Sequence, residues 1–146
     1  MFRLRQTRLP PLARGRSPTL AGGPGVLLVG AGGSLGAVCR YLVGGWATDR
    51  LGSAFPYATL LVNASGSCLL GLVLTAVSRR TKPSDGLRLL VAVGFLGAYT
   101  TFSTFSVETL SLLQQQAYLT AALNVGGSVA LAMLAVACGA LVGRWL

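Results

Sequence analysis

The chain has 146 residues, of which 53% are hydrophobic and only 10% are charged, whereas about 25% of the residues in a typical soluble domain are charged. It contains no His, three acidic residues and twelve basic residues, so it lacks the parts of a Ser-His-Asp triad or of an imidazole zinc site. The length allows one domain or a compact membrane bundle. The composition therefore favours an integral membrane protein, and we do not expect an enzyme.

Four windows of the chain carry no charge: residues 17–39, 51–78, 89–107 and 109–143. A bilayer core requires about 20 apolar residues in helical conformation. We therefore expect an all-α membrane protein with four transmembrane helices at 25–46, 57–77, 87–113 and 118–142. The second and fourth spans show no polar face repeating every 3.6 residues, which argues against packing in a soluble core.

The first 24 residues differ in composition from the rest of the chain. They hold five Arg among several Pro and Gly residues, and such a segment cannot bury enough apolar surface to order itself. We expect a basic disordered cytoplasmic tail at 1–24 and a four-helix domain at 25–146. A cleaved signal peptide is the alternative, but the apolar run that follows continues as a full span. A misassigned start codon would also account for the tail.

The distribution of basic residues predicts the topology. With four spans, the N-terminus, the second loop and the C-terminus share one side of the membrane, and this side holds ten basic residues. The opposite side holds Arg50 alone, because Arg40 falls inside the first span. By the positive-inside rule, both termini are expected to be cytoplasmic.

Small residues recur at a spacing of four in the first and last spans, as in the pairs Gly32/Gly36, Gly33/Ala37 and Gly139/Gly143. This spacing lets helix backbones approach closely in a membrane. It predicts a tight bundle and favours an oligomer.

Two polar side chains in the first half of the chain have two interpretations each. Arg40 either extends toward the outer interface or makes an electropositive vestibule. Asn63 has two amide donors, which are satisfied either by a neighbouring helix or by a passing anion.

The third span is the most informative. Residues 100–111, TTFSTFSVETLS, contain seven hydroxyl side chains and follow Gly94 and Gly97, which indicates a helix broken near its middle and lining something polar. Phe102 and Phe105 are three residues apart and share a face. Glu108 continues that face at the same spacing of three, and as the one acid inside a span it marks a functional position.

The run GFLGAYTTFSTFSVE (94–108) resembles the small bacterial fluoride channels of the CrcB/Fluc family. GAGGSLGAVCRY (30–41) and YATLLVNASGSCLLG (57–71) also look like the patterns of that family. The resemblance covers the chain from about residue 25 to the end, with the motif of the third span as its most specific part, and leaves out the basic tail.

The resemblance implies a channel that passively exports fluoride across the bacterial plasma membrane, built as an antiparallel dimer with two pores. By position, Asn63 resembles the pore asparagine, and Phe102 and Phe105 resemble the phenylalanine pair whose ring edges face the anion. The backbone carbonyls of Gly97 and Thr100 match the helix break that holds a structural sodium ion (Na+) at the dimer interface.

The resemblance also assigns more peripheral positions. Arg40 matches an arginine of the first helix, and Ser128 matches a serine of the fourth. Asn124 departs from the family pattern, which has an aromatic hydroxyl residue there, although its amide is able to donate to an anion directly. The family's polar track corresponds to Ser103, Thr104, Ser106 and Glu108.

The bias of ten basic residues to one has a consequence for assembly. A chain that inserts in both orientations needs nearly balanced loops, so we favour a fixed-orientation subunit that pairs with an oppositely oriented homologous chain. A dual-topology homodimer is the alternative. A non-conducting or partner-dependent subunit is a rival function. A proton-coupled exporter of the small multidrug type is disfavoured, because such a carrier needs a carboxylate where this chain has Arg40.

Overall fold

The computed structural model describes residues 22–79 and 84–145, and every described segment of regular structure is helical. Four helical spans in it are long and apolar enough to cross a membrane, which confirms the predicted number. Only the last three residues of the predicted tail are described, and Gly23 and Pro24 belong to the first helix. The remainder of that tail lies outside the described residues. The elements are α1 (Gly23–Leu51), α2 (Tyr57–Ser78), α3 (Asp85–Leu87), η1 (Arg88–Leu96), α4 (Gly97–Tyr99), α5 (Phe102–Gln114) and α6 (Tyr118–Val142).

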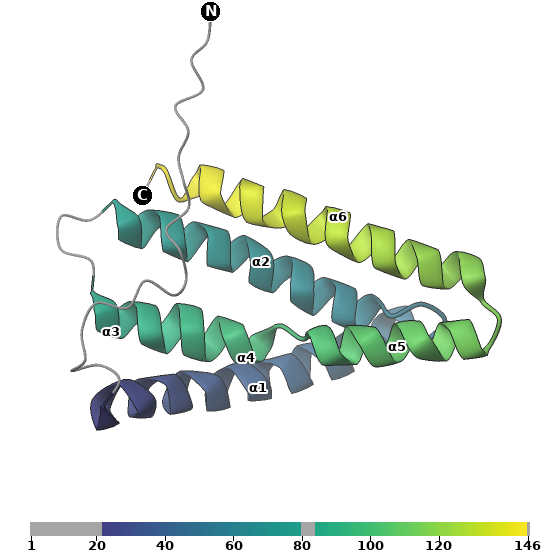
Figure 1. Ribbon diagram of the computed structural model, residues 1–146, viewed down its shortest axis with the longest axis horizontal. Helices are drawn as coiled ribbons and strands as arrows, with labels where there is room; N and C mark the ends of the chain where they lie inside the picture. The colour runs from purple at the N-terminus through teal and green to yellow at the C-terminus, as the bar shows by residue number, and fades with distance from the viewer. Residues whose placement is uncertain (1–21, 80–83, 146) are drawn as a thin grey trace, which may run out of the picture.

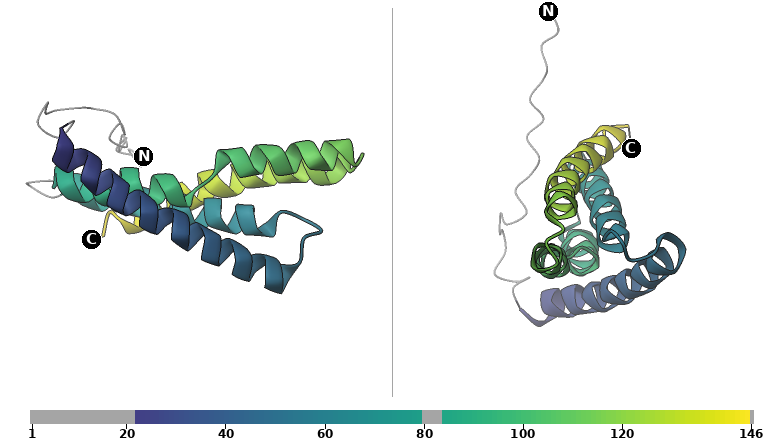
Figure 2. Two further views of the ribbon diagram at one scale, coloured as in Figure 1. Left: turned by 90° about the horizontal axis from the view of Figure 1, so that it is seen from below. Right: turned by 90° about the vertical axis from the view of Figure 1, so that its right-hand side faces the viewer.

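The helices form an elongated bundle with α1 and α6 on opposite sides (Figure 1). The start of α1, the end of α2, α3 and the end of α6 lie at one end, and the α1–α2 connection and the α5–α6 turn lie at the other. Seen from below, α5 and α6 diverge from α1 and α2 toward that second end (Figure 2, left). The described ends of the chain therefore share one end of the bundle, as an even number of spans requires.

The third span is a composite of four elements between Asp85 and Gln114. Its first half contains the π-helix η1, whose wider turns (hydrogen bonds from residue i to i+5) are uncommon and often lie near functional sites. This π-helix is not predicted by the sequence pattern. It ends at α4, and α5 follows after two non-helical residues.

Glycines set the spacing between α1 and η1. A Cβ atom added at Gly32 would lie 2.0 Å from the Leu90 carbonyl oxygen, and one at Gly36 would lie 2.1 Å from the Phe95 carbonyl oxygen. From the other side, a Cβ at Gly94 would lie 2.7 Å from the Val29 carbonyl oxygen. The backbones are therefore in direct contact, which only glycine allows.

The pair Gly139/Gly143 has the same role between α6 and α2. A Cβ at Gly139 would lie 1.9 Å from the Cys68 carbonyl oxygen, and Gly71 of α2 has a similar contact with Val136 of α6. The Gly33/Ala37 pair makes no such contact, because a Cβ added at Gly33 would lie 3.9 Å from its nearest neighbours, which is an ordinary van der Waals distance. The Gly-xxx-Gly steps at Gly32/Gly36 and Gly139/Gly143 are thus used inside one subunit, and they do not themselves argue for an oligomer.

We expect Gly36→Ala to lower the thermal stability of the purified protein in detergent. The new methyl group would overlap a backbone carbonyl that cannot rotate away, and overpacking of this kind costs about 1–3 kcal/mol. Gly30→Ala on the same helix is the matched control, because nothing lies within 4 Å of its added Cβ. Equal melting temperatures for the two variants would contradict the close α1–η1 contact.

Candidate functional site

The third span is interrupted at Thr100 and Thr101. Their backbone is extended (φ −78°, ψ 156° and φ −146°, ψ 120°), between α4 and α5. Asn63 of α2 bonds both polar groups of Thr101: its Nδ2 donates to the Thr101 carbonyl at 2.9 Å, and its Oδ1 accepts from the Thr101 amide at 2.8 Å. The amide side chain thus replaces two hydrogen bonds that a continuous helix would make within itself.

Thr101 also begins α5. Its Oγ1 accepts from the Thr104 backbone amide at 3.2 Å, as an N-cap residue does. The same oxygen lies 3.0 Å from Thr104 Oγ1 and 3.2 Å from Ser103 Oγ. Three hydroxyls are thus gathered at the first turn of α5, with Thr101 itself only 8% exposed.

A groove of about 280 Å³ lies beside this interruption, and we call it the phenylalanine groove. It brings together residues far apart in the sequence: Asn63 and Ser67 from α2, Thr100 and Thr101, Phe102 and Phe105 from α5, and Ser128 from α6. The rings of the two phenylalanines are 5.4 Å apart between centroids and inclined by 39°. Phe102 is 78% exposed in the single chain, so the groove has one open side.

Asn63, Phe102, Phe105 and Ser128 were each predicted as pore residues, and the fold places all of them in this groove. Asn63 uses one of its two amide hydrogens on Thr101, which leaves the other for a ligand. Asn124 does not line the groove. It is only 1% exposed and donates to Thr109 at 2.9 Å, so the expectation that its amide donates directly to an anion is not supported.

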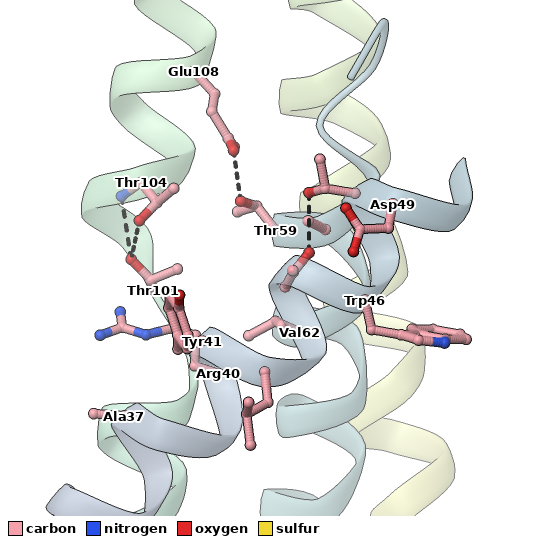
Figure 3. Close-up of a pocket in the computed structure, with 15 residues that line it drawn as sticks. Ala37, Arg40, Tyr41, Trp46, Asp49, Thr59, Val62, Thr101, Thr104 and Glu108 are labelled. Atoms are coloured by element: carbon pink, nitrogen blue, oxygen red, sulfur yellow. Dashed lines mark hydrogen bonds between the residues drawn. The ribbon is translucent and has the colours of Figure 1, made fainter. Parts of the chain in front are cut away.

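A second cavity of about 540 Å³ lies between α1, α2 and α5, and we call it the arginine cavity (Figure 3). Arg40 and Asp49 line it from α1, and Thr104 and Glu108 line it from α5. Thr101 lines both this cavity and the phenylalanine groove. The two spaces are therefore neighbours on either side of the interruption.

Glu108 is tied to α2 within this second cavity. Thr59 donates to its Oε1 at 2.8 Å (Figure 3). Its Oε2 is buried and has no hydrogen-bond partner among the residues that the structure describes. The pair connects α2 and α5 where the two helices diverge.

The expectation that Glu108 continues the face of the two phenylalanines is wrong. Each step of three residues falls about 60° short of a full turn, so two steps displace a side chain by about 120° around the helix. Phe102 and Phe105 therefore line one space and Glu108 lines another. Arg40 is likewise in the arginine cavity and not in the groove.

The polar-track residues are divided by the fold. Thr104 and Glu108 line the arginine cavity, whereas Ser103 and Ser106 line neither space. The Ser106 hydroxyl donates to the Phe102 carbonyl at 2.8 Å, and Ser103 contacts Thr101. These two hydroxyls are exposed in the single chain.

Comparison with known proteins gives the family. A family model described as "CrcB-like protein, Camphor Resistance (CrcB)" matches residues 27–140. The chain belongs to the CrcB-like family. This confirms the resemblance, and together with the four apolar spans it makes the chain a multi-pass membrane protein.

Relatives of this CrcB-like chain cover most of its length. The Fluoride-specific ion channel FluC of Acidobacterium capsulatum is 49% identical over 118 residues, which is 81% of this chain and 94% of the relative. The proteins of the same name from Rhizobium meliloti and Geobacter sulfurreducens are 45% and 44% identical, over 78% and 83% of this chain and 91% and 98% of theirs. All residues of the groove and of the arginine cavity fall inside the region matched by the CrcB-like family model.

Sequence reasoning missed three polar residues of this CrcB-like site. Thr59 bonds Glu108, Thr101 organises the interruption, and Ser67 lines the groove. Thr101 was visible as one of seven clustered hydroxyls but was not distinguished from its neighbours. Thr59 and Ser67 gave no signal, because single hydroxyl residues in an apolar helix usually bond their own backbone.

The carbonyl groups at the end of α4 form a candidate cation site. In a continuous helix the Thr101 amide would donate to the Gly97 carbonyl, but it donates to Asn63 instead. Gly97 is exposed, and a Cβ added there would come no closer than 4.0 Å to a neighbour. Hard oxygen ligands at the negative end of a helix suit Na+, so Gly97 and Thr100 fit the predicted ion.

Proposed function

We propose that the protein is a fluoride-selective channel that lets fluoride leave the bacterial cytoplasm passively. The observation that carries the proposal is the phenylalanine groove, which joins an amide, hydroxyl groups and two aromatic rings in a chain of the CrcB-like family. Its relatives are named fluoride-specific ion channels. Conduction requires no covalent chemistry, so the protein is not an enzyme.

The composition of the groove suits fluoride. The ion is small and strongly hydrated, so several short-range donors must replace its water before it can cross hydrocarbon. Asn63 has a free amide hydrogen, Ser67 and Ser128 have hydroxyls, and the edges of aromatic rings carry partial positive charge. No Arg or Lys of the described segments, 22–79 and 84–145, lines the groove, and these neutral donors hold the anion weakly enough for release. Arg40 lies in the neighbouring cavity, outside the groove.

A structural Na+ at the end of α4 is part of this proposal. The carbonyl groups of Gly97 and Thr100 would hold it, and its charge would favour an anion on the nearby side of the interruption. The exposure of Gly97 supports a position where a second subunit supplies further oxygen ligands.

The exposed surface of α5 supports the antiparallel dimer that is part of this proposal. This helix has no buried residue in the single chain, and the groove with its amide and hydroxyl groups is open at Phe102. Polar groups facing lipid are costly, so a second subunit must cover this side. The ten-to-one charge bias favours a homologous partner of opposite orientation over a second copy, with both termini of this chain in the cytoplasm.

The function is tested with proteoliposomes loaded with potassium fluoride, with a fluoride electrode in the external solution. We expect rapid efflux that requires a potassium ionophore, because passive movement of an anion is electrogenic. Efflux without the ionophore would favour a proton-coupled carrier. Absence of fluoride efflux, from the single chain and from the chain co-expressed with its partner, would refute the channel and favour a non-conducting subunit.

The same assay distinguishes the two dimers. If the chain requires an oppositely oriented partner, the purified single polypeptide gives no efflux and the co-expressed pair restores it. Robust efflux from the single polypeptide would defeat the obligate heterodimer and establish the dual-topology homodimer.

A further inference from the structure

A chain of hydrogen bonds passes behind the wall of the phenylalanine groove, from α6 to α5. The Ser128 hydroxyl donates to Asn124 Oδ1 at 3.3 Å, and Asn124 Nδ2 donates to Thr109 Oγ1 at 2.9 Å. The Thr109 hydroxyl donates to the Phe105 carbonyl at 2.7 Å. Ser128 and Phe105 line the groove, whereas Asn124 and Thr109 do not. The network therefore begins and ends at groove residues and is hidden between them.

The Ser128 hydroxyl differs from other hydroxyls on these helices. Ser34, Ser65 and Ser106 each donate to the backbone carbonyl four residues earlier, at 2.9, 2.7 and 2.8 Å. The residue four before Ser128 is Asn124, and there the bond goes to the side-chain oxygen instead of the carbonyl. Hydroxyl-to-oxygen bonds are usually about 2.5–3.0 Å long. At 3.3 Å, Ser128 is held loosely.

The orientation of the Asn124 amide follows from the direction of the other bonds. Thr109 gives its proton to the Phe105 carbonyl, so its oxygen accepts from Asn124 Nδ2. This directs Oδ1 toward Ser128. With only 1% of its surface exposed, Asn124 cannot contact an ion in the groove itself.

We propose that Asn124 is a positioning residue for anion conduction. It diverts the Ser128 hydroxyl from the backbone carbonyl and keeps it available to a small, strongly hydrated anion in the groove. When the anion enters, Ser128 turns its O–H from Asn124 Oδ1 to the charged acceptor, which forms the stronger bond. The inference rests on the proposed function, and it deepens that function by adding a residue that acts without touching the ion.

The test compares Asn124→Leu, Ser128→Ala, the double variant and Thr109→Ser in fluoride-loaded proteoliposomes. Asn124→Leu should let Ser128 return to the carbonyl of residue 124, so flux should fall about tenfold, as much as in Ser128→Ala, the effect of losing one bond to an ion. The double variant should lose no more than either single variant. Thr109→Ser keeps the hydroxyl that accepts from Asn124 Nδ2, so Asn124 Oδ1 stays directed toward Ser128, and we expect its flux to be close to that of the wild type.

A second readout separates positioning from stability. Fluoride should raise the melting temperature of the wild type and of Thr109→Ser, but less so that of Asn124→Leu and Ser128→Ala. If the losses from Asn124→Leu and Ser128→Ala multiply in the double variant, or if fluoride raises the melting temperature of Asn124→Leu as much as that of the wild type, Asn124 only joins two helices and the inference is overturned. Wild-type flux from Asn124→Leu would overturn it too, while leaving the channel itself established. Absence of any wild-type flux would instead refute the proposed function.

Discussion

Asn63→Asp is expected to abolish fluoride efflux. The carboxylate keeps an acceptor for the Thr101 amide but loses the Nδ2 donor that bonds the Thr101 carbonyl at 2.9 Å. It also places a negative charge on the wall of the groove that the anion enters. At a separation of 4 Å and an effective dielectric constant of about 20, two like charges repel by about 4 kcal/mol, which is a factor of roughly a thousand. The initial rate in loaded proteoliposomes measures the loss.

Two controls separate charge from loss of structure. Gln114→Glu makes the same amide-to-carboxylate change at the exposed end of α5, outside the groove and the arginine cavity, and should conduct as the wild type does. Asn63→Leu removes both bonds to Thr101 without adding charge, and it should reduce flux and lower the melting temperature. A folded Asn63→Asp protein with more than half of the wild-type rate would exclude Asn63 from the anion pathway.

Phe102→Ile is expected to reduce efflux by about tenfold, because the positive ring edge is replaced by an aliphatic group that offers an anion nothing comparable. Phe102 lines the groove and is 78% exposed in the single chain, so its replacement should have little effect on packing within the subunit. The rate of fluoride efflux and the melting temperature are measured together. We expect the rate to fall while the melting temperature stays near that of the wild type.

Tyr118→Ile is the matched control for Phe102→Ile. It removes another exposed ring, at the start of α6 and outside the groove and the arginine cavity, so it should leave the flux unchanged. Equal rates for Phe102→Ile and the wild type would show that the ring at position 102 does not contact the ion. Equal losses in both variants would indicate a general effect of aromatic residues on insertion or assembly.

The asparagine at position 63 illustrates why the two predicted uses of an amide need not exclude each other. The sequence left open whether a neighbouring helix or an anion satisfies its donors. The structure shows one donor on Thr101, and we propose that fluoride uses the other. An amide has two hydrogens in fixed directions, so a single side chain can both hold the interruption and face the groove.

The sequence by itself determined the number of spans and the family. Transmembrane spans are recognisable because each must supply about 20 apolar residues whatever surrounds it, and this requirement is local. The motif at 94–108 identified the family for a similar reason, since it is a contiguous run. The spacing of Gly32/Gly36 and Gly139/Gly143 also predicts a close approach of helices. It does not predict which helix each pair contacts.

Only the tertiary structure decided which space each polar side chain lines. Phe102 and Glu108 are six residues apart but lie in different spaces, because each step of three residues falls short of a full turn and the two steps add up around α5. The sequence also gave no indication that Thr59 bonds Glu108 or that Asn124 supports Ser128. The bond between Thr59 and Glu108 joins residues that are 49 positions apart, and the bond between Asn124 and Ser128 joins residues that are four positions apart. A hydroxyl or amide group in a helix has several possible hydrogen-bond partners, and the neighbouring side chains and helices decide which of them it uses.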